Sequence, residues 1–518
     1  MLLDTIMPSG NMRSLMILGL VVLTAVQISL ADVGDDYPNY DNPIRTAAED
    51  EVKNLPGLND AVNFRHYSGY LRADRDKSAN KFLHYWFVES QSNPAKDPLL
   101  LWLNGGPGCS SMGGMFTELG PFVVDDDGKT LKMNPFSWNK AANVLFLESP
   151  FGVGFSYSTR LIEVHTDDST AKENLLALKS FMKKFPQYRN NSLYLSGESY
   201  AGVYLPTLGV LADADPEINL KGIAIGNGYL DAAMLMKSVI FFSYYHGLVG
   251  KSTWNDITNY CCDGQPPSRE TCSFSPMSGI RCMLALQNVN NALEAPGLNP
   301  YNLYGKCLGI KPHSLSDLST KGRKGRSSRE DIDKALRGLA FKESFLMDEK
   351  PFHMFNASLE NLGEEPPCID DHVLSNYLNN EAVRKAIHIP KKVGSWDTCS
   401  RLIYFVKYPK LPGGLAPQMK QLIDSKRNLT MLVYNGDVDT VCNFLGDEWF
   451  VDNLGRKVTK DYSIWRVGGQ VAGFVKHYEG ITFATVRGSG HMVPGDRPQE
   501  ALKMIETFLS ANSQNVYL

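Results

Sequence analysis

The stretch Ser196-Gly197-Glu198-Ser199-Tyr200-Ala201-Gly202 follows an apolar run that ends at Leu195, and a helical pattern comes directly after it. A strand that turns sharply into a helix at a serine exposes the hydroxyl and points the next backbone N–H at a developing oxyanion. Gly197 and Ala201 are small enough for this turn, although the strict motif has glycine at the position of Ala201. The stretch predicts a nucleophilic Ser199; taken alone, a surface serine in a loop is the alternative.

Short apolar and β-branched runs alternate with helical patterns along much of the chain. Leu175, Leu178 and Met182 recur at helical spacing, and a second helical pattern covers residues 501–508. Alternation of this kind is typical of a mostly parallel sheet that helices cover on both faces. The sequence therefore predicts an α/β fold. The expected strands cover residues 82–89, 99–103, 144–147, 193–195, 223–225, 431–434 and 481–486.

The alternation weakens between residues 232 and 418, and a basic run covers Lys321–Arg326 within this region. We interpret residues 232–418 as a cap subdomain inserted into a core that residues 32–231 and 419–518 form together. A basic run is usually a solvated loop. A site of proteolytic processing is the alternative for Lys321–Arg326.

The N-terminus has the pattern of a secretory signal peptide. An apolar run covers Leu15–Leu30, Arg13 precedes it, and small residues lie at its end. We predict a signal peptide over residues 1–31, with no membrane segment after its removal. An uncleaved membrane anchor is the alternative, because the run is nearly long enough to span a bilayer. Three glycosylation tripeptides agree with secretion and begin at Asn190, Asn356 and Asn428.

The composition excludes several classes of protein. The chain has 518 residues, of which 43% are hydrophobic and 21% charged, so it can bury a large core and is not a disordered protein. Its 52 basic and 56 acidic residues give a net charge of −4, which is too near neutral to indicate a nucleic-acid partner. The nine cysteines are an odd number, so at least one thiol stays free if disulfides form.

Three further motifs follow predicted strands. They read Trp-Leu-Asn-Gly-Gly-Pro-Gly-Cys-Ser-Ser at residues 102–111, Tyr-Asn-Gly-Asp-Val-Asp at 434–439 and Gly-His-Met-Val-Pro at 490–494. Together with residues 196–202, and in this order, they resemble the signatures of the serine carboxypeptidases, a family of α/β-hydrolases. The resemblance extends from about residue 55 to the C-terminal helix. It implies an α/β-hydrolase fold with an inserted cap, and carboxypeptidase activity.

The resemblance implies a catalytic triad of Ser199, Asp439 and His491, whose order along the chain is also that of the α/β-hydrolases. His491 would take the proton of Ser199 and later pass it to the leaving amine, while Asp439 would fix the imidazole tautomer. Asp437 competes with Asp439 for the role of the acid. The family match assigns that role to Asp439, and we expect Asp437 to stabilise the turn.

Members of the family bind the C-terminal carboxylate of the substrate through a hydrogen-bond network that includes glutamate. A glutamate can donate a hydrogen bond to a carboxylate only while it is protonated, and burial beside another carboxyl raises its pKa. The resemblance therefore implies activity at acidic pH. Without the resemblance, a solvated residue at a helix start is an equal alternative for Glu198. The implied carboxylate-binding residues are Trp102, Asn104, Gly105, Glu118 and Glu198, and the implied oxyanion donors are the backbone N–H groups of Gly106 and Tyr200.

Two more side chains are assigned by resemblance. Met492 is the residue type of family members that prefer hydrophobic residues on the C-terminal side of the scissile bond, with core packing as the alternative. Cys442 would be the free thiol and would lie near the active site. Eight cysteines allow 105 pairings, so the sequence alone does not assign the disulfides. The resemblance implies Cys109–Cys399, Cys261–Cys282, Cys262–Cys272 and Cys307–Cys368; a zinc site is not expected, because no CxxC pair exists.

Two other functions compete with peptide hydrolysis. Acyltransferases of the family tend to lose the residues that match Asn104 and Glu198, and both are present here. A protective scaffold for other lysosomal enzymes is known in the family, and an intact triad does not exclude that role. We expect peptides with a free C-terminus as substrates, a homodimer, lysosomal glycosidases as further partners, and no cofactor or metal. The expected location is the lysosome, the vacuole or the cell exterior.

Overall fold

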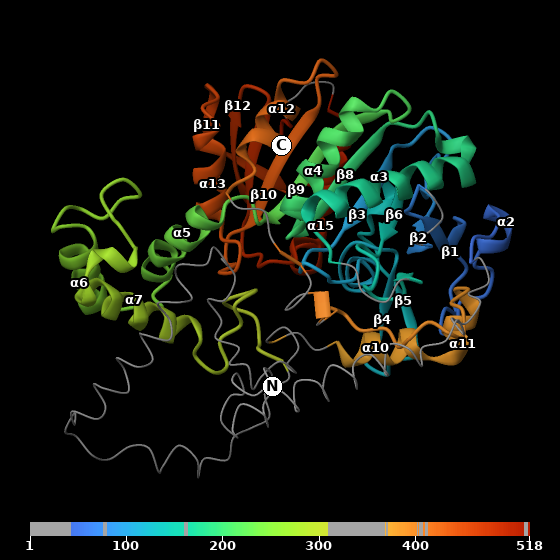
Figure 1. Cartoon of the computed structure of the whole chain (residues 1–518), viewed down its shortest axis with the longest axis horizontal. Coiled ribbons are helices and arrows are strands. Elements are labelled where there is room, and N and C mark those ends of the chain that lie inside the picture. Colours follow the sequence, from blue (N-terminus) through green and yellow to red (C-terminus); the bar gives the residue numbers. More distant parts are fainter. Residues whose placement is uncertain are drawn as a thin grey trace, which may run out of the picture. The chain divides into compact units, whose positions relative to one another are not determined.

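Strands from both halves of the chain pair into one sheet, which has 11 strands in the part of the chain that the structure describes (Figure 1). The structure is a computed structural model, and it describes residues 43–75, 80–159, 164–308, 368, 371–400, 402–403, 408–409, 413–511 and 516–518. The predictions for residues 1–31, Lys321–Arg326 and Asn356 lie outside these residues. In spatial order the strands are β1 (His66–Arg72), β2 (Lys81–Val88), β6 (Asn143–Leu147), β3 (Leu99–Leu103), β8 (Leu193–Ser199), β9 (Leu220–Gly228), β10 (Thr430–Gly436), β13 (Ile481–Val486), β12 (Gln470–Tyr478) and β11 (Val458–Val467), with β7 (Tyr157–Ser158) beside β2.

The centre of the sheet is parallel and its borders are antiparallel. Strands β6, β3, β8, β9, β10 and β13 pair in parallel, whereas β1, β2, β12 and β11 join by antiparallel pairing. A separate two-stranded sheet joins β4 (Phe122–Val124) to β5 (Leu131–Met133). The mostly parallel α/β sheet predicted from the sequence is confirmed, and each of the seven expected strands coincides with a strand of the structure.

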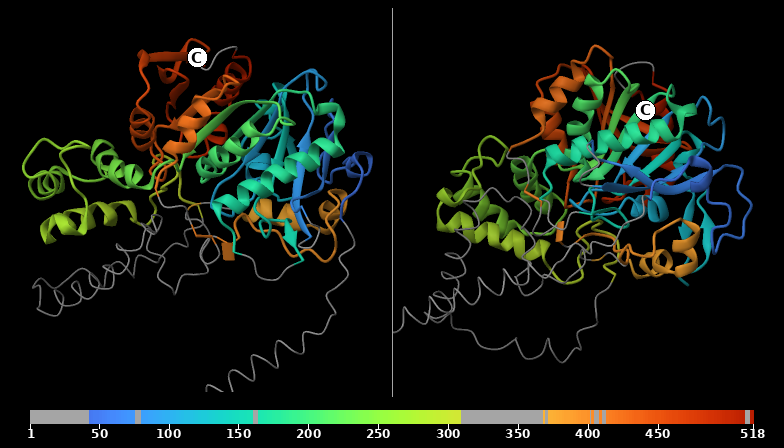
Figure 2. Two further views of the ribbon diagram at one scale, coloured as in Figure 1. Left: turned by 45° about the horizontal axis from the view of Figure 1, so that its top comes forward. Right: turned by 45° about the vertical axis from the view of Figure 1, so that its right-hand side comes forward.

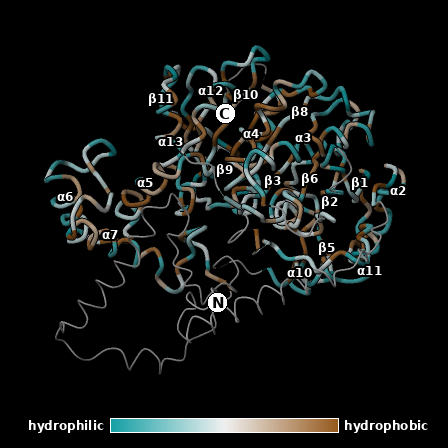
Figure 3. The backbone as a smooth tube through the Cα atoms, in the orientation of Figure 1, coloured by the Kyte–Doolittle hydropathy of each residue, from teal (hydrophilic) through white to brown (hydrophobic). Residues whose placement is uncertain are grey.

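Alternate residues of each central strand face opposite sides of the sheet, and each side has its own helices (Figure 2). Leu101 and Leu103 pack into the core formed with α3, α4, α12 and α13, whereas Leu100 and Trp102 pack into the core formed with α10 and α15. Hydrophobic segments accordingly concentrate along the strands (Figure 3). The helices are α2 (Ala47–Asp50), α3 (Asp167–Lys184), α4 (Ala201–Ala214), α5 (Ala232–Tyr245), α6 (Lys251–Cys261), α7 (Ile280–Leu293), α10 (His372–Asn379), α11 (Glu381–Ala386), α12 (Ala416–Ile423), α13 (Phe444–Asn453), α14 (Val493–Asp496) and α15 (Pro498–Leu509).

The described part of residues 232–418, the region predicted as a cap, contains two separate helical groups and the first residues of α12 (Figure 1). Helices α5, α6 and α7 enclose a small core of their own, and α5 packs against α13. Helices α10 and α11 lie at the other end of the molecule, where α10 contacts β4 and contributes to a core of the sheet. No helix of the described residues is long and apolar enough to cross a membrane.

The parallel strands determine where chemistry can take place. Because they share one direction, their carboxyl ends meet at one edge of the sheet, and ligands of such sheets bind there. Strand β3 ends at Leu103, β8 at Ser199, β10 at Gly436 and β13 at Val486. All four motifs singled out from the sequence lie at or directly after these ends.

Candidate active site

Ser199 lies at the turn from β8 to α4 in a strained conformation. Its φ angle is 62°, in the left-handed region that residues with a side chain rarely adopt. Gly197 makes room for the turn, because a Cβ there would lie 2.2 Å from the carbonyl oxygen of Leu103 and 2.8 Å from the Cβ of Ala201. The strain is tolerated because α4 and β3 hold both sides of the turn, and such strain is typical of an exposed nucleophile.

His491 and Asp439 form a hydrogen-bonded pair at the ends of β13 and β10. The distance from His491 Nδ1 to Asp439 Oδ2 is 2.7 Å, and both residues are buried. Asp439 Oδ2 also accepts hydrogen bonds from Asn227 Nδ2 at 2.9 Å and from the Cys442 N–H at 3.1 Å. The backbone N–H of His491 donates to the backbone carbonyl of Tyr301, and the Tyr301 ring contacts the imidazole edge to face. This arrangement places the proton of the neutral imidazole on Nδ1 and leaves Nε2 as an acceptor.

Asp437 has a different environment from Asp439. Its Oδ1 accepts a hydrogen bond from the Gly488 N–H at 2.6 Å, and its own N–H donates to the carbonyl of Val486. Asp437 thus joins the end of β10 to the loop after β13. The structure brings Asp439, rather than Asp437, into contact with His491.

The loop after β3 passes very close to the Ser199 turn. A Cβ on Gly105 would lie 2.3 Å from the backbone N of Tyr200 and 2.7 Å from the Cβ of Ser199, so only glycine fits there. The next residue, Gly106, has a φ angle of +112°. The two segments that hold the expected oxyanion donors, Gly106 and Tyr200, are therefore neighbours.

A buried carboxyl cluster lies beside this loop. Asn104 Nδ2 donates to Glu118 Oε1 at 3.1 Å and to Glu198 Oε1 at 2.9 Å. Asn104 Oδ1 in turn accepts from Trp102 Nε1 at 2.8 Å and from the Gly114 N–H at 3.1 Å. The indole therefore fixes the orientation of the amide, and the amide holds both carboxyls.

The two glutamates hold a proton more tightly than free glutamate does. Burial raises the pKa of Glu198 well above its ordinary value, and the charge of Glu118 and a hydrogen bond between the two carboxyls raise it further. Burial also raises the pKa of Glu118. The Oε2 atom of each carboxyl is buried and receives no hydrogen bond from an N–H or hydroxyl group of the described residues. The cluster therefore has polar atoms left to bind a ligand.

Met492 and Cys442 occupy different depths. Met492 is partly buried and precedes α14, and a Cβ on Gly495 would lie within 4.0 Å of both the Met492 Cβ and the Glu118 Cγ. Cys442 is the cysteine outside the four disulfides and is fully buried, and its backbone N–H donates to Asp439. The thiol is thus near the triad acid but has no exposed surface.

The structure contains the four disulfides that the family resemblance implies: Cys109–Cys399, Cys261–Cys282, Cys262–Cys272 and Cys307–Cys368. The first joins the loop after β3 to a segment of the predicted cap, and the next two lie in the core of α5–α7. The glycosylation candidates Asn190 and Asn428 are both exposed.

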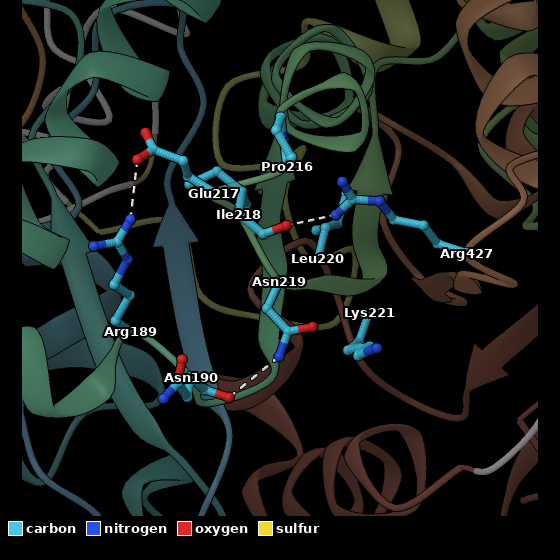
Figure 4. Close-up of a pocket in the computed structure, with 9 residues that line it drawn as sticks. All are labelled: Arg189, Asn190, Pro216, Glu217, Ile218, Asn219, Leu220, Lys221 and Arg427. Carbon is cyan, nitrogen blue, oxygen red and sulfur yellow. Dashed lines mark hydrogen bonds and ion pairs between the residues drawn. The ribbon is translucent and has the colours of Figure 1, made fainter.

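A surface hollow lies at the opposite edge of the sheet, near the amino ends of β8 and β9 (Figure 4). Its arginines are occupied: Arg189 forms an ion pair with Glu217, and Arg427 donates to the carbonyl of Ile218. The hollow includes none of the candidate catalytic or substrate-binding residues, and the residue assigned from the sequence that lines it is the glycosylation candidate Asn190. We therefore place the candidate active site at the carboxyl edge of the sheet.

Some residues of the site were not found by sequence reasoning. Asn227 and Asn435 lie at the ends of β9 and β10, and Asp447 lies in the first turn of α13; all three are fully buried around the Asp439 turn. Two sequence signals exist: the pair of glycines around Asn227 indicates a turn directly after a strand, and Asn435 stands within the motif at residues 434–439.

Comparisons with known proteins agree with this geometry. A family model described as serine carboxypeptidase matches residues 56–511. The chain is 44% identical to the lysosomal protective protein (cathepsin A) of Mus musculus over 469 residues, which are 89% of this chain and 94% of the mouse protein. It is 39% identical to the serine carboxypeptidase ctsa-4.1 of Caenorhabditis elegans, over 91% of this chain and 95% of the relative. The crystal structure of Kex1(Δ)p, a prohormone-processing carboxypeptidase from Saccharomyces cerevisiae, superposes with a TM-score of 0.65 at 23% identity, covering 90% of this chain and 96% of that one; this likeness shows the fold.

Proposed function

The chain belongs to the serine carboxypeptidase family, and from this premise we propose that it removes C-terminal residues from peptides through an acyl-enzyme on Ser199. The observation that supports this most directly is the position of the cluster of Asn104, Glu118 and Glu198. Its member Glu198 directly precedes Ser199 in the sequence. A carboxylate-binding site next to a nucleophile restricts cleavage to the last peptide bond.

In this proposal His491 acts as general base and then as general acid. Its Nε2 accepts the Ser199 proton as the hydroxyl oxygen attacks the scissile carbonyl, and the imidazolium then protonates the leaving amine. Asp439 stabilises the imidazolium through the bond to Nδ1. Water, activated by the same histidine, attacks the acyl-enzyme and restores Ser199.

The oxyanion of the tetrahedral intermediate would bind the backbone N–H groups of Gly106 and Tyr200. Donors of this kind each contribute roughly 2.7–4 kcal/mol to the transition state. The close approach that Gly105 permits supports this assignment, since it keeps the two segments together. Fixed backbone donors need no reorganisation during the reaction.

The carboxylate of the substrate would bind a protonated glutamate of the pair. Asn104 donates both of its Nδ2 hydrogens to Glu118 and Glu198, so it would redirect one of them to the substrate. Trp102 and Gly105 would support the site. Glu198 has the more strongly raised pKa, so we assign the proton to it. The acid is the active form, and activity is therefore lost as the pH rises through the raised pKa of the pair. We propose an acidic pH optimum on this ground.

Met492 would contact the residue that is released. A Cβ built on Gly495 would lie 4.0 Å from the Met492 Cβ and 3.9 Å from the Glu118 Cγ, so Met492 is close to the carboxylate-binding cluster. A thioether side chain there favours hydrophobic residues. Cys442 lies on the Asp439 turn and is buried, so we propose that it influences substrate preference through the packing below the active site.

The test compares N-blocked dipeptides with the corresponding dipeptide amides. The wild-type enzyme should hydrolyse the free acids and much less of the amides at acidic pH, with hydrophobic C-terminal residues preferred, and Ser199→Ala should be inactive on both. Equal rates on acids and amides would refute exopeptidase recognition. Transfer of the acyl group to an alcohol in preference to water would support the acyltransferase alternative.

A second role is supported by the 44% identity with a protein named lysosomal protective protein. We propose, as part of this role, a homodimer that associates with lysosomal glycosidases, and a location in the lysosome, the vacuole or outside the cell. Residues 232–418 would form the cap, and Asn190 and Asn428 would be glycosylated. Gel filtration with candidate glycosidases tests the association, and separate elution excludes it for those enzymes.

A further inference from the structure

Asp447 is a fully buried carboxyl that the proposed reaction does not use. Its Oδ2 accepts hydrogen bonds from the Gly228 N–H at 2.9 Å and from Asn435 Nδ2 at 2.8 Å. Its Oδ1 is buried and has no hydrogen-bond partner among the described residues. An ionised carboxylate with one oxygen left bare in the protein interior is costly.

Asn435 also has a buried oxygen that receives no hydrogen bond from the described residues. Its Nδ2 uses both hydrogens, one on Asp447 Oδ2 and one on the carbonyl of Cys442 at 3.1 Å. Its Oδ1 is also buried and has no partner among the described residues. An amide oxygen and a carboxyl oxygen on two hydrogen-bonded side chains thus both lack a donor. A carboxylic acid has one donor that a carboxylate lacks, and a single proton on Asp447 Oδ1 would satisfy both atoms.

We propose that Asp447 is a neutral carboxylic acid in the folded enzyme, that it forms a doubly hydrogen-bonded pair with the Asn435 amide, and that this pair positions the turn that presents Asp439. Asp447 is thus a positioning residue, since it acts on the triad through this turn.

The contacts lead directly from the pair to the catalytic acid. Asn435 holds the carbonyl of Cys442, and the N–H of the same Cys442 donates to Asp439 Oδ2. Asn227 donates to Cys442 O at 3.4 Å as well as to Asp439 Oδ2. Displacement of the pair would therefore move the Cys442 peptide and, with it, the carboxylate that orients His491.

The surroundings favour the neutral form. Burial is the largest cause that raises the pKa of Asp447, and the charge of Asp439 raises it further, while the bonds from Asn435 and Gly228 lower it. Among the elements packed on α13, β9 presents the Gly228 N–H and β10 the Asn435 amide, and the turn after β10 holds the Cys442 thiol. Helix α5 presents Leu235 and Ser238 at the neighbouring Gly446. The charged side chain that faces Asp447 is thus Asp439, which has the same sign as an ionised Asp447.

The sign of the pH effect follows from this. The folded state keeps the Asp447 proton, whereas the unfolded chain loses it near pH 3.9, the ordinary value for aspartate. A group whose pKa is raised by folding stabilises the protein fully below the unfolded value, and this contribution falls as the pH rises toward the folded value. Ionisation of Asp447 would also place a second buried negative charge beside Asp439.

The experiment compares Asp447→Asn, Asp447→Ala and the control Asp452→Asn. Asparagine can donate to Asn435 Oδ1 and accept from its Nδ2, so it mimics the neutral acid. Asp452 lies on the same helix but binds Lys476 and Tyr478. The readouts are kcat and KM against pH, the urea midpoint against pH, and the infrared band of protonated carboxyl groups in the difference between wild type and Asp447→Asn.

Asp447→Asn should keep kcat within about twofold of the wild-type value at acidic pH, and it should lose less stability than wild type as the pH rises. Asp447→Ala should lower kcat about tenfold with little change in KM. The infrared difference should contain the acid band, and Asp452→Asn should resemble wild type. If Asp447→Asn is as impaired as Asp447→Ala, or if its stability keeps the wild-type pH dependence and the band is missing, the proposal is wrong. The positioning effect rests on the proposed role of Asp439, but the infrared and urea measurements need no catalysis and distinguish the two failures.

Discussion

At the scale of single residues, the buried carboxyl groups of the site differ in the hydrogen bonds that they receive. Asp439 receives three hydrogen bonds on its Oδ2 atom, from His491, Asn227 and Cys442, which suit a carboxylate. Glu198 shares its surroundings with a second carboxyl and has an oxygen that receives no donor. The number of donors on each carboxyl thus distinguishes Asp439 from Glu198.

The first prediction concerns Glu198→Gln. The raised pKa of Glu198 keeps the wild-type residue protonated above the ordinary range of glutamate, and activity should fall as the pH rises through that pKa. Glutamine is neutral at every pH, so the variant should lose most activity at acidic pH, about tenfold for one weakened hydrogen bond, and its optimum should move upward. The measurement is kcat/KM for a blocked dipeptide against pH.

The dipeptide amide is the control for Glu198→Gln, because it has no carboxylate to bind. Its hydrolysis should change much less in the variant than hydrolysis of the free acid. A pH profile identical to that of wild type would contradict the shared-proton account of the carboxyl pair.

The second prediction concerns Asn227→Ala. This change removes the donor at 2.9 Å from Asp439. Hydrogen bonds to charged groups contribute roughly 1.5–3 kcal/mol, so kcat should fall at least about tenfold if the bond orients the acid in the transition state. Single-turnover acylation kinetics measure the effect. Asn219→Ala, directly before the same strand at the opposite edge of the sheet, is the matched control and should leave kcat unchanged. Equal kcat in both variants would assign Asn227 a role in folding alone.

At the scale of the elements, the sequence predicted the strands better than the residues that connect them. The central strands are fully buried, so their apolar runs are visible in the sequence. Strand β11 was missed, because most of its residues are exposed and give no apolar pattern. Asn227 and Asp447 were missed for a related reason: a single buried Asn or Asp looks like any surface residue until neighbours from distant strands are known.

The third prediction concerns Gly105→Ala, at the contact between the loop after β3 and the β8–α4 turn. The new Cβ would overlap the backbone N of Tyr200 and push the two segments apart. A displacement of about 1 Å can reduce the rate about a hundredfold, so kcat should fall by that order while the circular dichroism spectrum stays the same. Gly250→Ala, which meets no atom within 4 Å, is the control. A fully active Gly105→Ala enzyme would show that the oxyanion donors lie elsewhere.

At the scale of the whole molecule, buried ion pairs connect elements that are far apart in the sequence. Asp50 in α2 is fully buried and binds Lys184 at the end of α3, and it also accepts a hydrogen bond from Tyr85 of β2 at 2.9 Å. The side chains of Lys184 and Asp50 are 5% and 0% exposed, and this burial lowers the pKa of Lys184. The contact joins α2 and α3 to the sheet.

The fourth prediction concerns Lys184→Met, which leaves Asp50 buried without its cation. Breaking one partner of a buried pair costs about 3–5 kcal/mol, so the urea midpoint should fall strongly. The double variant Asp50→Asn/Lys184→Met should recover most of the loss. Arg189→Met breaks an exposed pair with Glu217 and should cost less than about 1 kcal/mol. Equal losses for the buried and the exposed pair would contradict this account.

Among the described residues, the chain leaves the sheet after Gly228 and returns to it at Thr430, yet β9 and β10 are direct parallel neighbours. The pairing of β9 with β10 therefore does not depend on the length of the chain segment that connects them. Helices inserted at this junction can be lengthened, shortened or replaced during evolution without a change in the relative positions of the nucleophile, the acid and the base. Diversification of substrate choice within this architecture should accordingly concentrate in residues 232–418, and the catalytic edge should change slowly.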